Sequence, residues 1–164
     1  MNHLKKQNIE SSLEVLKFNS GIYLLIIELD DDLKIRIGAL GEIEFKKGIY
    51  CYVGSAQKNL IQRLKRHLRK DKKLHWHIDY LLRYAKVRRI YVAPLNKEYE
   101  SIIANELMKY FDYILNFGNS DAKKDKSHLF FINKLIAEKD FNKPNPKYFS
   151  KIIKKFGFGV LLQY

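Results

Sequence analysis

An apolar run, GIYLLIIEL at Gly21 to Leu29, constrains the fold more than any other feature, and the acidic residues Asp30 to Asp32 end it abruptly. Its length and β-branched content are typical of a buried central strand. A second run, IYCYVG at Ile49 to Gly54, has the same character and leads directly into a stretch of helical periodicity. Because both runs need apolar cover, the sequence predicts a sheet with helices packed on it.

Shorter elements surround these two strands. Leu33 to Ile37 and Glu42 to Phe45 alternate apolar and charged residues on either side of a glycine-containing turn, which predicts a hairpin with one wet face. The fold class that we predict is α+β, with a small, largely antiparallel β-sheet flanked by helices. The further predicted strands are Val87 to Ala93 and His128 to Ile132, and the predicted helices are Asn59 to Lys70, Trp76 to Tyr84, Glu98 to Phe111 (with Tyr99, Ile103, Leu107 and Tyr110 inward) and, after a break at Pro144 and Pro146, Tyr148 to Phe156.

The length of 164 residues suits one compact domain. We expect an N-terminal extension over residues 1–20, the main domain over 21–140, and a basic C-terminal extension over 141–164 that packs on the same domain. The single cysteine, Cys51, excludes an internal disulfide. No apolar run is long enough to cross a bilayer, and the first residues lack an apolar signal core, so we expect a cytoplasmic protein.

The net charge of +13 is concentrated in two blocks, residues 58–73 and 123–164, which each carry +7. Clustered Lys and Arg residues are typical of a surface that neutralises phosphates, so the charge favours a nucleic-acid partner. Three alternatives are a solvated lysine face, a surface that docks an acidic protein, and an anionic membrane. The membrane is the least favoured of these, because the first block lacks a broad apolar face with Trp or Phe.

Five polar side chains stand out by the faces that they occupy in the predicted strands and helices: Tyr23, Tyr52, Arg63, His67 and Glu100. Strand alternation puts Tyr52 on the same face as Tyr50 and Gly54. At helical periodicity Arg63 and His67 lie at the edge of the apolar stripe and should flank the sheet, and Glu100 falls in the apolar sector of its helix whereas Glu98 points outward. Each residue has an ordinary structural explanation when it is taken alone, so the pattern matters more than any member.

The pattern resembles the GIY-YIG nuclease superfamily. The matching motifs are Gly21-Ile22-Tyr23, the tripeptide YVG at 52–54 in place of YIG, an arginine on the following helix, and a glutamate on a later helix. The closer resemblance is to the Uri-type subgroup, through the blocks GALGEIEFKKGIYCYVGSA, LIQRLKRHLRKDKKLHWHIDYLL, ESIIANEL and SDAKKDKSHLFF. A pair of cysteines usual in that subgroup is missing after Ser120-Asp121, so any role of those cysteines is absent. A second GIY, at 48–50, abuts the YVG strand and is therefore not the catalytic one.

The resemblance implies hydrolysis of phosphodiester bonds in DNA, including branched or damaged DNA. It implies that Tyr23, by preference, acts as general base or orients the water, while Tyr52 holds the phosphate or shares that work. Arg63 would clamp the phosphate, either Arg63 or the metal would lower the pKa of the phenol, and His67 would relay a proton or contact phosphate. Glu100 would bind one divalent ion, Mg²⁺ or Mn²⁺. The alternative is a catalytically inactive nucleic-acid-binding module with the same fold.

The block from Lys58 to Lys73 is predicted to be the main surface that tracks the DNA backbone, and the basic C-terminal segment that begins near Pro144 would add contacts. We favour a helix around His77 over a strand, which would turn His75, His77 and Asp79 to one face like metal ligands. No role follows from the sequence for Asp121, Ser127 or His128. The predicted nucleic-acid-binding residues are Lys58, Arg66, Lys70, Lys72, Lys73, His75 and His77.

Overall fold

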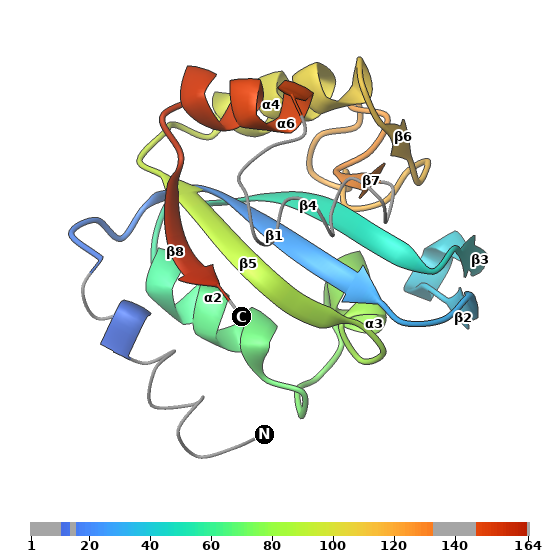
Figure 1. The fold of residues 1–164 in the computed structure, drawn as a ribbon. Helices are drawn as coiled ribbons and strands as arrows, with labels where there is room; N and C mark the ends of the chain where they lie inside the picture. Colours follow the sequence, from blue (N-terminus) through green and yellow to red (C-terminus); the bar gives the residue numbers. More distant parts are fainter. Residues whose placement is uncertain (1–10, 14–15, 133–146, 164) are drawn as a thin grey trace.

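The computed structural model describes residues 11–13, 16–132 and 147–163, and Figure 1 shows their arrangement. A six-stranded sheet in the order β6-β7-β4-β1-β5-β8 forms the centre, and every neighbouring pair of its strands is antiparallel. The α+β class predicted from the sequence is therefore confirmed. The strands of this sheet are β1 (Gly21–Leu29), β4 (Gly48–Ala56), β5 (Lys86–Ala93), β6 (Asp112–Tyr113), β7 (Leu129–Ile132) and β8 (Gly159–Gln163).

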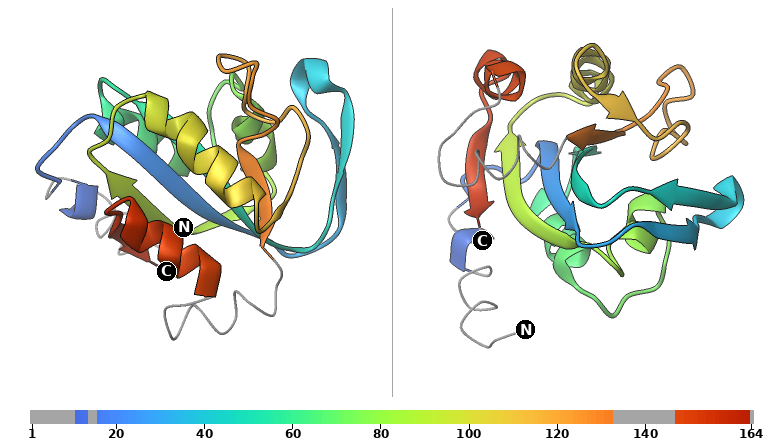
Figure 2. Two further views of the ribbon diagram at one scale, coloured as in Figure 1. Left: turned by 90° about the horizontal axis from the view of Figure 1, so that it is seen from above. Right: turned by 45° about the vertical axis from the view of Figure 1, so that its right-hand side comes forward.

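Helices cover both faces of the sheet, as the two views in Figure 2 show. On one face α2 (Leu60–Leu68) and α3 (His77–Leu81) pack Leu60, Leu64 and Leu81 against the sheet. On the other face α4 (Glu98–Met108) and α6 (Lys147–Lys155) contribute Ile103 and Ile152 to a second cluster. The sheet is thus the middle of three layers, which explains why β1 is apolar on both sides.

Strand β1 pairs along its whole length with β4, and the register sets Tyr23 opposite Gly54 and Leu25 opposite Tyr52. Alternation then directs Tyr23 and Tyr52 to the α2 side and Cys51 and Val53 to the α4 side. The face assignment predicted from the sequence is confirmed. The two tripeptides lie on adjacent central strands.

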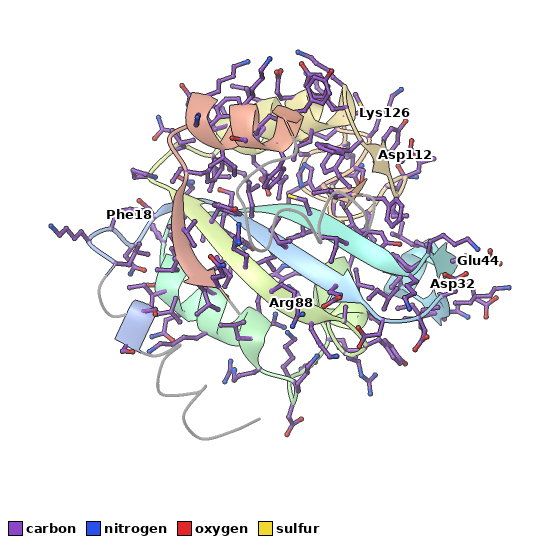
Figure 3. The ribbon with its side chains drawn as sticks, in the orientation of Figure 1. Phe18, Asp32, Glu44, Arg88, Asp112 and Lys126 are labelled. Atoms are coloured by element: carbon purple, nitrogen blue, oxygen red, sulfur yellow. The ribbon has the colours of Figure 1, made fainter. Side chains whose placement is uncertain are left out.

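The predicted hairpin forms a separate two-stranded sheet of β2 (Leu33–Arg36) and β3 (Glu42–Phe45), joined through the short 3-10 helix Gly38–Leu40. In Figure 3 the labels of Asp32 and Glu44 mark this hairpin at the margin of the molecule. Both residues are exposed, and Phe45 is buried, so the hairpin has one wet face as expected.

Three features differ from the prediction. Strand β8, which pairs with β5, and the two-residue β6 were not expected. Helix α4 ends at Met108, and Tyr110, expected to point inward, is 45% exposed and stacks on Tyr148. The reason is that the chain has left the helix by then, so the helical period no longer determines which face a residue occupies.

Two further observations bear on the ends of the domain. The predicted break at Pro144 and Pro146, and the boundary at residues 140 and 141, lie outside the described residues. The segment after it begins with α6, one residue earlier than predicted, and continues into the sheet as β8. Among the helices that the structure describes, none has the length and apolar content to cross a membrane.

Candidate active site

A pocket of about 530 Å³ opens where the end of β4 meets the beginnings of α2 and α4. All five residues of the predicted catalytic set come from segments that border it, and four of them line it. The lining residues are Tyr23, Tyr52, Gly54, Ser55, Ala56, Gln57, Lys58, Arg63, His75, Trp76, His77, Lys97, Glu100, Gly118, Ser120, Asp121, Ala122 and His128. The fifth, His67, lies behind Tyr23 and is 2% exposed.

Tyr23 and His67 form a buried hydrogen-bonded pair, with 2.7 Å between the phenol oxygen and Nε2. Tyr52 packs beside them, with its ring centroid 6.5 Å from that of Tyr23 and 6.4 Å from that of His67. The three rings are therefore fixed by packing on a central part of the sheet. Tyr50, on the same face, is turned away, because its hydroxyl donates to the Lys46 carbonyl.

Two glycines make room for these tyrosines. A Cβ atom at Gly54 would overlap the Tyr23 ring, so the last position of the YVG motif must be glycine. Gly118 has φ +75° and would bring a Cβ to 2.9 Å from the Tyr52 ring. The role of Gly54 is readable from the motif, whereas that of Gly118 depends on a contact between distant segments.

Burial determines the protonation of the pair. It raises the pKa of Tyr23 far above its ordinary value, although Arg63 acts in the opposite direction. Arg63 therefore acts in the expected direction, but desolvation is the larger effect, so the pKa of Tyr23 is raised in the net. Burial, reinforced by the positive charge of Lys72, lowers the pKa of His67 to about 3. Both groups are neutral at physiological pH.

The buried His67 predicts a pH dependence of stability. Its pKa is about 3 in the folded protein against 6.5 for the ordinary side chain. Between these values the unfolded chain binds a proton that the folded protein does not. The free energy of unfolding is therefore unaffected by His67 above about pH 6.5. As the pH falls from there toward 3, protonation of the unfolded chain lowers it by up to about 1.4 kcal/mol per pH unit. Denaturant titrations from pH 6.5 to 4.5 should show a steeper loss in the wild type than in His67→Gln, and parallel curves would contradict this.

Arg63 is held at the pocket wall by two contacts. Its Nη1 donates to the Ser55 carbonyl at 3.1 Å, and its guanidinium lies 4.5 Å from the centroid of the Trp76 ring. Arg66 stacks on the same ring at 4.2 Å. The Trp76 ring thus contacts two guanidiniums and helps to position Arg63, which flanks the sheet as expected for a residue at the edge of the apolar stripe.

Asp79 is the anchor of the second guanidinium. Arg66 forms two 2.8 Å hydrogen bonds to the Asp79 carboxylate, whose side chain is fully buried. Burial alone would raise the pKa of Asp79, but the bonds from Arg66 and from the backbone amides of Trp76 and His75 hold it below its ordinary value. The stretch around His77 is a helix, as we favoured, and His75 contacts Asp79 through its backbone amide.

Several cations expected to contact DNA are engaged within the fold. Lys70 donates to the carbonyls of Leu82 and Ala85, and Lys72, whose side chain is 4% exposed, donates to the carbonyls of Arg66 and His67. Among the described residues, the pocket lining includes Lys58, His75 and His77 of the predicted set, but not Arg66, Lys70, Lys72 or Lys73.

Lys97 was missed by the sequence analysis, although it lies one helical turn before Glu100. It is exposed, lines the pocket and helps to hold down the pKa of Glu100. Burial is the larger influence and raises that pKa above its ordinary value. Glu100 is half-buried and Glu98 exposed, as the helical period predicted.

The loop before β7 contributes further residues to the pocket lining. His77 Nδ1 accepts a hydrogen bond from the Gly118 amide at 3.0 Å, so this ring supports the loop. His128 and Asp125 form a buried pair, with 2.7 Å between Nε2 and Oδ2, and His128 Nδ1 lies 3.5 Å from a Glu100 oxygen. Asp121 lines the pocket, and Ser127 accepts and donates within its own turn.

Comparison with known proteins gives a family and no named relative. No curated protein and no solved structure matches the chain. A family model described as a domain of unknown function, DUF123, matches residues 22–147, which include both tyrosines, Arg63, His67, Glu100 and the loop before β7. Because this match covers most of the chain, the protein belongs to the DUF123 family.

Proposed function

We propose that the protein is a metal-dependent endonuclease of the GIY-YIG type, Uri-type subgroup, which hydrolyses phosphodiester bonds in DNA. The observation that carries the proposal is that the candidate catalytic side chains come together in one pocket. Tyr23, Tyr52, Arg63 and Glu100 come from four elements and line one pocket, with His67 bonded to Tyr23 behind it. A phenol, a guanidinium and a carboxylate are the groups that phosphodiester hydrolysis requires to guide water, stabilise the transition state and hold a cation.

Arg63 is the proposed phosphate clamp. Its guanidinium is held by Ser55 and Trp76, so little rotational freedom is lost when it binds a phosphate oxygen. A planar guanidinium can donate two parallel hydrogen bonds to a phosphate, and these strengthen as charge develops in the transition state. Lys58 and Lys97, both exposed at the pocket, add positive charge for the neighbouring DNA backbone.

Tyr23 and His67 are the proposed water-orienting pair. When the phenol donates a hydrogen bond to Nε2 of His67, the lone pairs of its oxygen remain free to accept a hydrogen bond, and then a proton, from the attacking water. His67, neutral because it is buried, is the next acceptor along that path. An arriving phosphate adds negative charge to the pocket and so favours the cationic form of His67.

Glu100 is the proposed metal-binding residue. A half-buried carboxylate whose pKa is raised by burial gains from a nearby cation, so the residue fits a divalent ion. Mg²⁺ or Mn²⁺, when bound, would polarise the phosphoryl oxygen and lower the pKa of its water. Among the described residues no group of three or more His, Cys, Asp and Glu side chains could hold a metal, so water and phosphate would complete the shell.

A catalytically inactive DNA-binding module is the second candidate, because the exposed cations around the pocket would serve binding without cleavage. A third candidate, docking of an acidic protein through the same basic surface, rests on the net charge of +13 alone. The cleavage assay decides between the first two. DNA affinity that does not fall as salt is raised would argue against an electrostatic DNA interface and favour the third.

The test of the proposed function is cleavage of labelled duplex, branched and single-stranded DNA with Mg²⁺, Mn²⁺ or EDTA. We expect cutting that EDTA abolishes and that Tyr23→Phe slows about 100-fold, since loss of a positioned acid or base costs roughly this much. Tyr50→Phe is the matched control, because it also removes one hydroxyl from a buried tyrosine on the same face of the sheet. Binding without cutting on every substrate would support the inactive module.

A further inference from the structure

A chain of buried polar groups behind Glu100 is not used by the proposed function. Ser101 Oγ donates to Asp125 Oδ2 at 2.6 Å, and the same oxygen lies 2.7 Å from Nε2 of His128. Asp125 is 5% exposed and His128 1% exposed. Asp125 and His128 belong to the block SDAKKDKSHLFF, for whose polar residues no role followed from the sequence.

The hydrogen bonds determine which nitrogen of His128 carries a proton. An ionised carboxylate only accepts hydrogen bonds, so Nε2 of His128 is the donor to Asp125. In the neutral ring Nδ1 is then left with a lone pair. A carboxylate behind a histidine that fixes its tautomer in this way is the usual second shell of a metal-binding imidazole.

Nδ1 of His128 faces Glu100 with nothing to satisfy it. Within the part of the chain that the structure describes, this buried atom has no hydrogen-bond partner. It lies 3.5 Å from Oε1 of Glu100, and both residues line the pocket. Two ligands ~2.1 Å from one ion, at tetrahedral or octahedral angles, lie ~3.0–3.4 Å apart, so a shift of a few tenths of an ångström would suffice. A buried orphan nitrogen at this distance from a carboxylate calls for a cation.

We propose that His128 Nδ1 and Glu100 Oε1 bind the same divalent ion, so that the metal site has two protein ligands, one of them nitrogen. This inference rests on the proposed function, because it assigns a ligand to the metal of that site. Asp125 and Ser101 are positioning residues, which hold the imidazole in the ligating tautomer. An imidazole ligand favours Mn²⁺ and other transition metals over Mg²⁺, which prefers oxygen.

Mn²⁺ binding, measured without DNA by electron paramagnetic resonance, tests this inference. We expect one Mn²⁺ site in the wild type, with a pulsed spectrum that shows coupling to one directly bound nitrogen. His128→Gln should lose that coupling and at least about tenfold in Mn²⁺ affinity, while Glu100→Gln should lose the site. His75→Gln is the matched control, because it removes another imidazole that lines the pocket and should keep both the affinity and the nitrogen signal.

If His128→Gln fails to fold, a nitrogen coupling in the wild type that persists in both His75→Gln and His77→Gln supports the inference, because those residues are the other imidazoles in the pocket lining. Mn²⁺ that depends on Glu100 but shows no nitrogen coupling would overturn the inference and would fit a His128–Glu100 ion pair instead. No Mn²⁺ binding at all would overturn it too, since a two-ligand site does not need DNA. Neither of these two results contradicts the proposed nuclease activity, which the cleavage assay tests separately.

Discussion

Arg63→Ala should reduce DNA cleavage about 1000-fold while DNA affinity changes only a few-fold. The expected decrease in rate is this large because the variant loses a pre-positioned hydrogen-bond donor that stabilises the negative charge developing in the transition state. The affinity is largely retained because Lys58, Lys97 and the remaining exposed cations still attract the DNA backbone. Single-turnover cleavage at saturating enzyme measures the first quantity, and a binding titration with EDTA present measures the second.

Two further variants distinguish position from charge. Arg69→Ala removes the same charge from an exposed residue that directly follows α2, so it should leave the single-turnover rate nearly unchanged. Arg63→Lys keeps the charge but loses the planar pair of donors and the stacking on Trp76, so it should restore only a small part of the rate. Equal rates for Arg63→Ala and Arg69→Ala would show that bulk charge, and not the clamp, matters.

Asp79→Ala should destabilise the fold by about 3–5 kcal/mol, the cost of leaving a buried charge without its partner. The Asp79 side chain is fully buried and pairs with Arg66 and with Lys72, which lies 3.7 Å away. It also accepts hydrogen bonds from the backbone amides of His75 and Trp76. The variant therefore removes the shared partner of two cations and two backbone amides at once. Urea denaturation monitored by circular dichroism would measure the decrease in the free energy of unfolding.

The matched control is Asp71→Ala. Asp71 is an exposed aspartate in the connection that leads from α2 into α3, the helix that contains Asp79, so its loss should change the free energy of unfolding by no more than about 0.5 kcal/mol. A similar loss in both variants would mean that this part of the chain tolerates neither change and that Asp79 has no special part. If Asp79→Ala lowers the free energy of unfolding only slightly, water must reach Arg66 and Lys72 in that variant.

The sequence predicts the central strands and most of the site because both follow from local periodicity. Alternation along β4 assigns Tyr52 its face, and the helical period separates Glu100 from Glu98. Strand β8 was not predicted, because its apolar residues find their partner in β5, far away along the chain. A strand of this kind is defined by its pairing more than by its own pattern.

The basic block shows a second limit of sequence reasoning. Lysine has a long flexible side chain, and nothing in the local pattern distinguishes Lys58, which lines the pocket, from Lys72, which is turned toward helix carbonyls. The same holds for His128, whose chemistry depends not only on its near neighbour Asp125 but also on Glu100, which comes from a separate helix, α4. Charge totals predict a class of partner, but the tertiary contacts decide which cations remain available.

Trp76, the single tryptophan of the chain, lies in the pocket wall in contact with the guanidiniums of Arg63 and Arg66. The fluorescence of an indole depends on the charges near its ring, and here one of those charges belongs to the residue that we propose binds a phosphate. The other is tied to Asp79 and stays in place. The protein therefore carries an intrinsic fluorophore within the candidate site, and we expect its fluorescence to change, without any added label, when a phosphate binds Arg63.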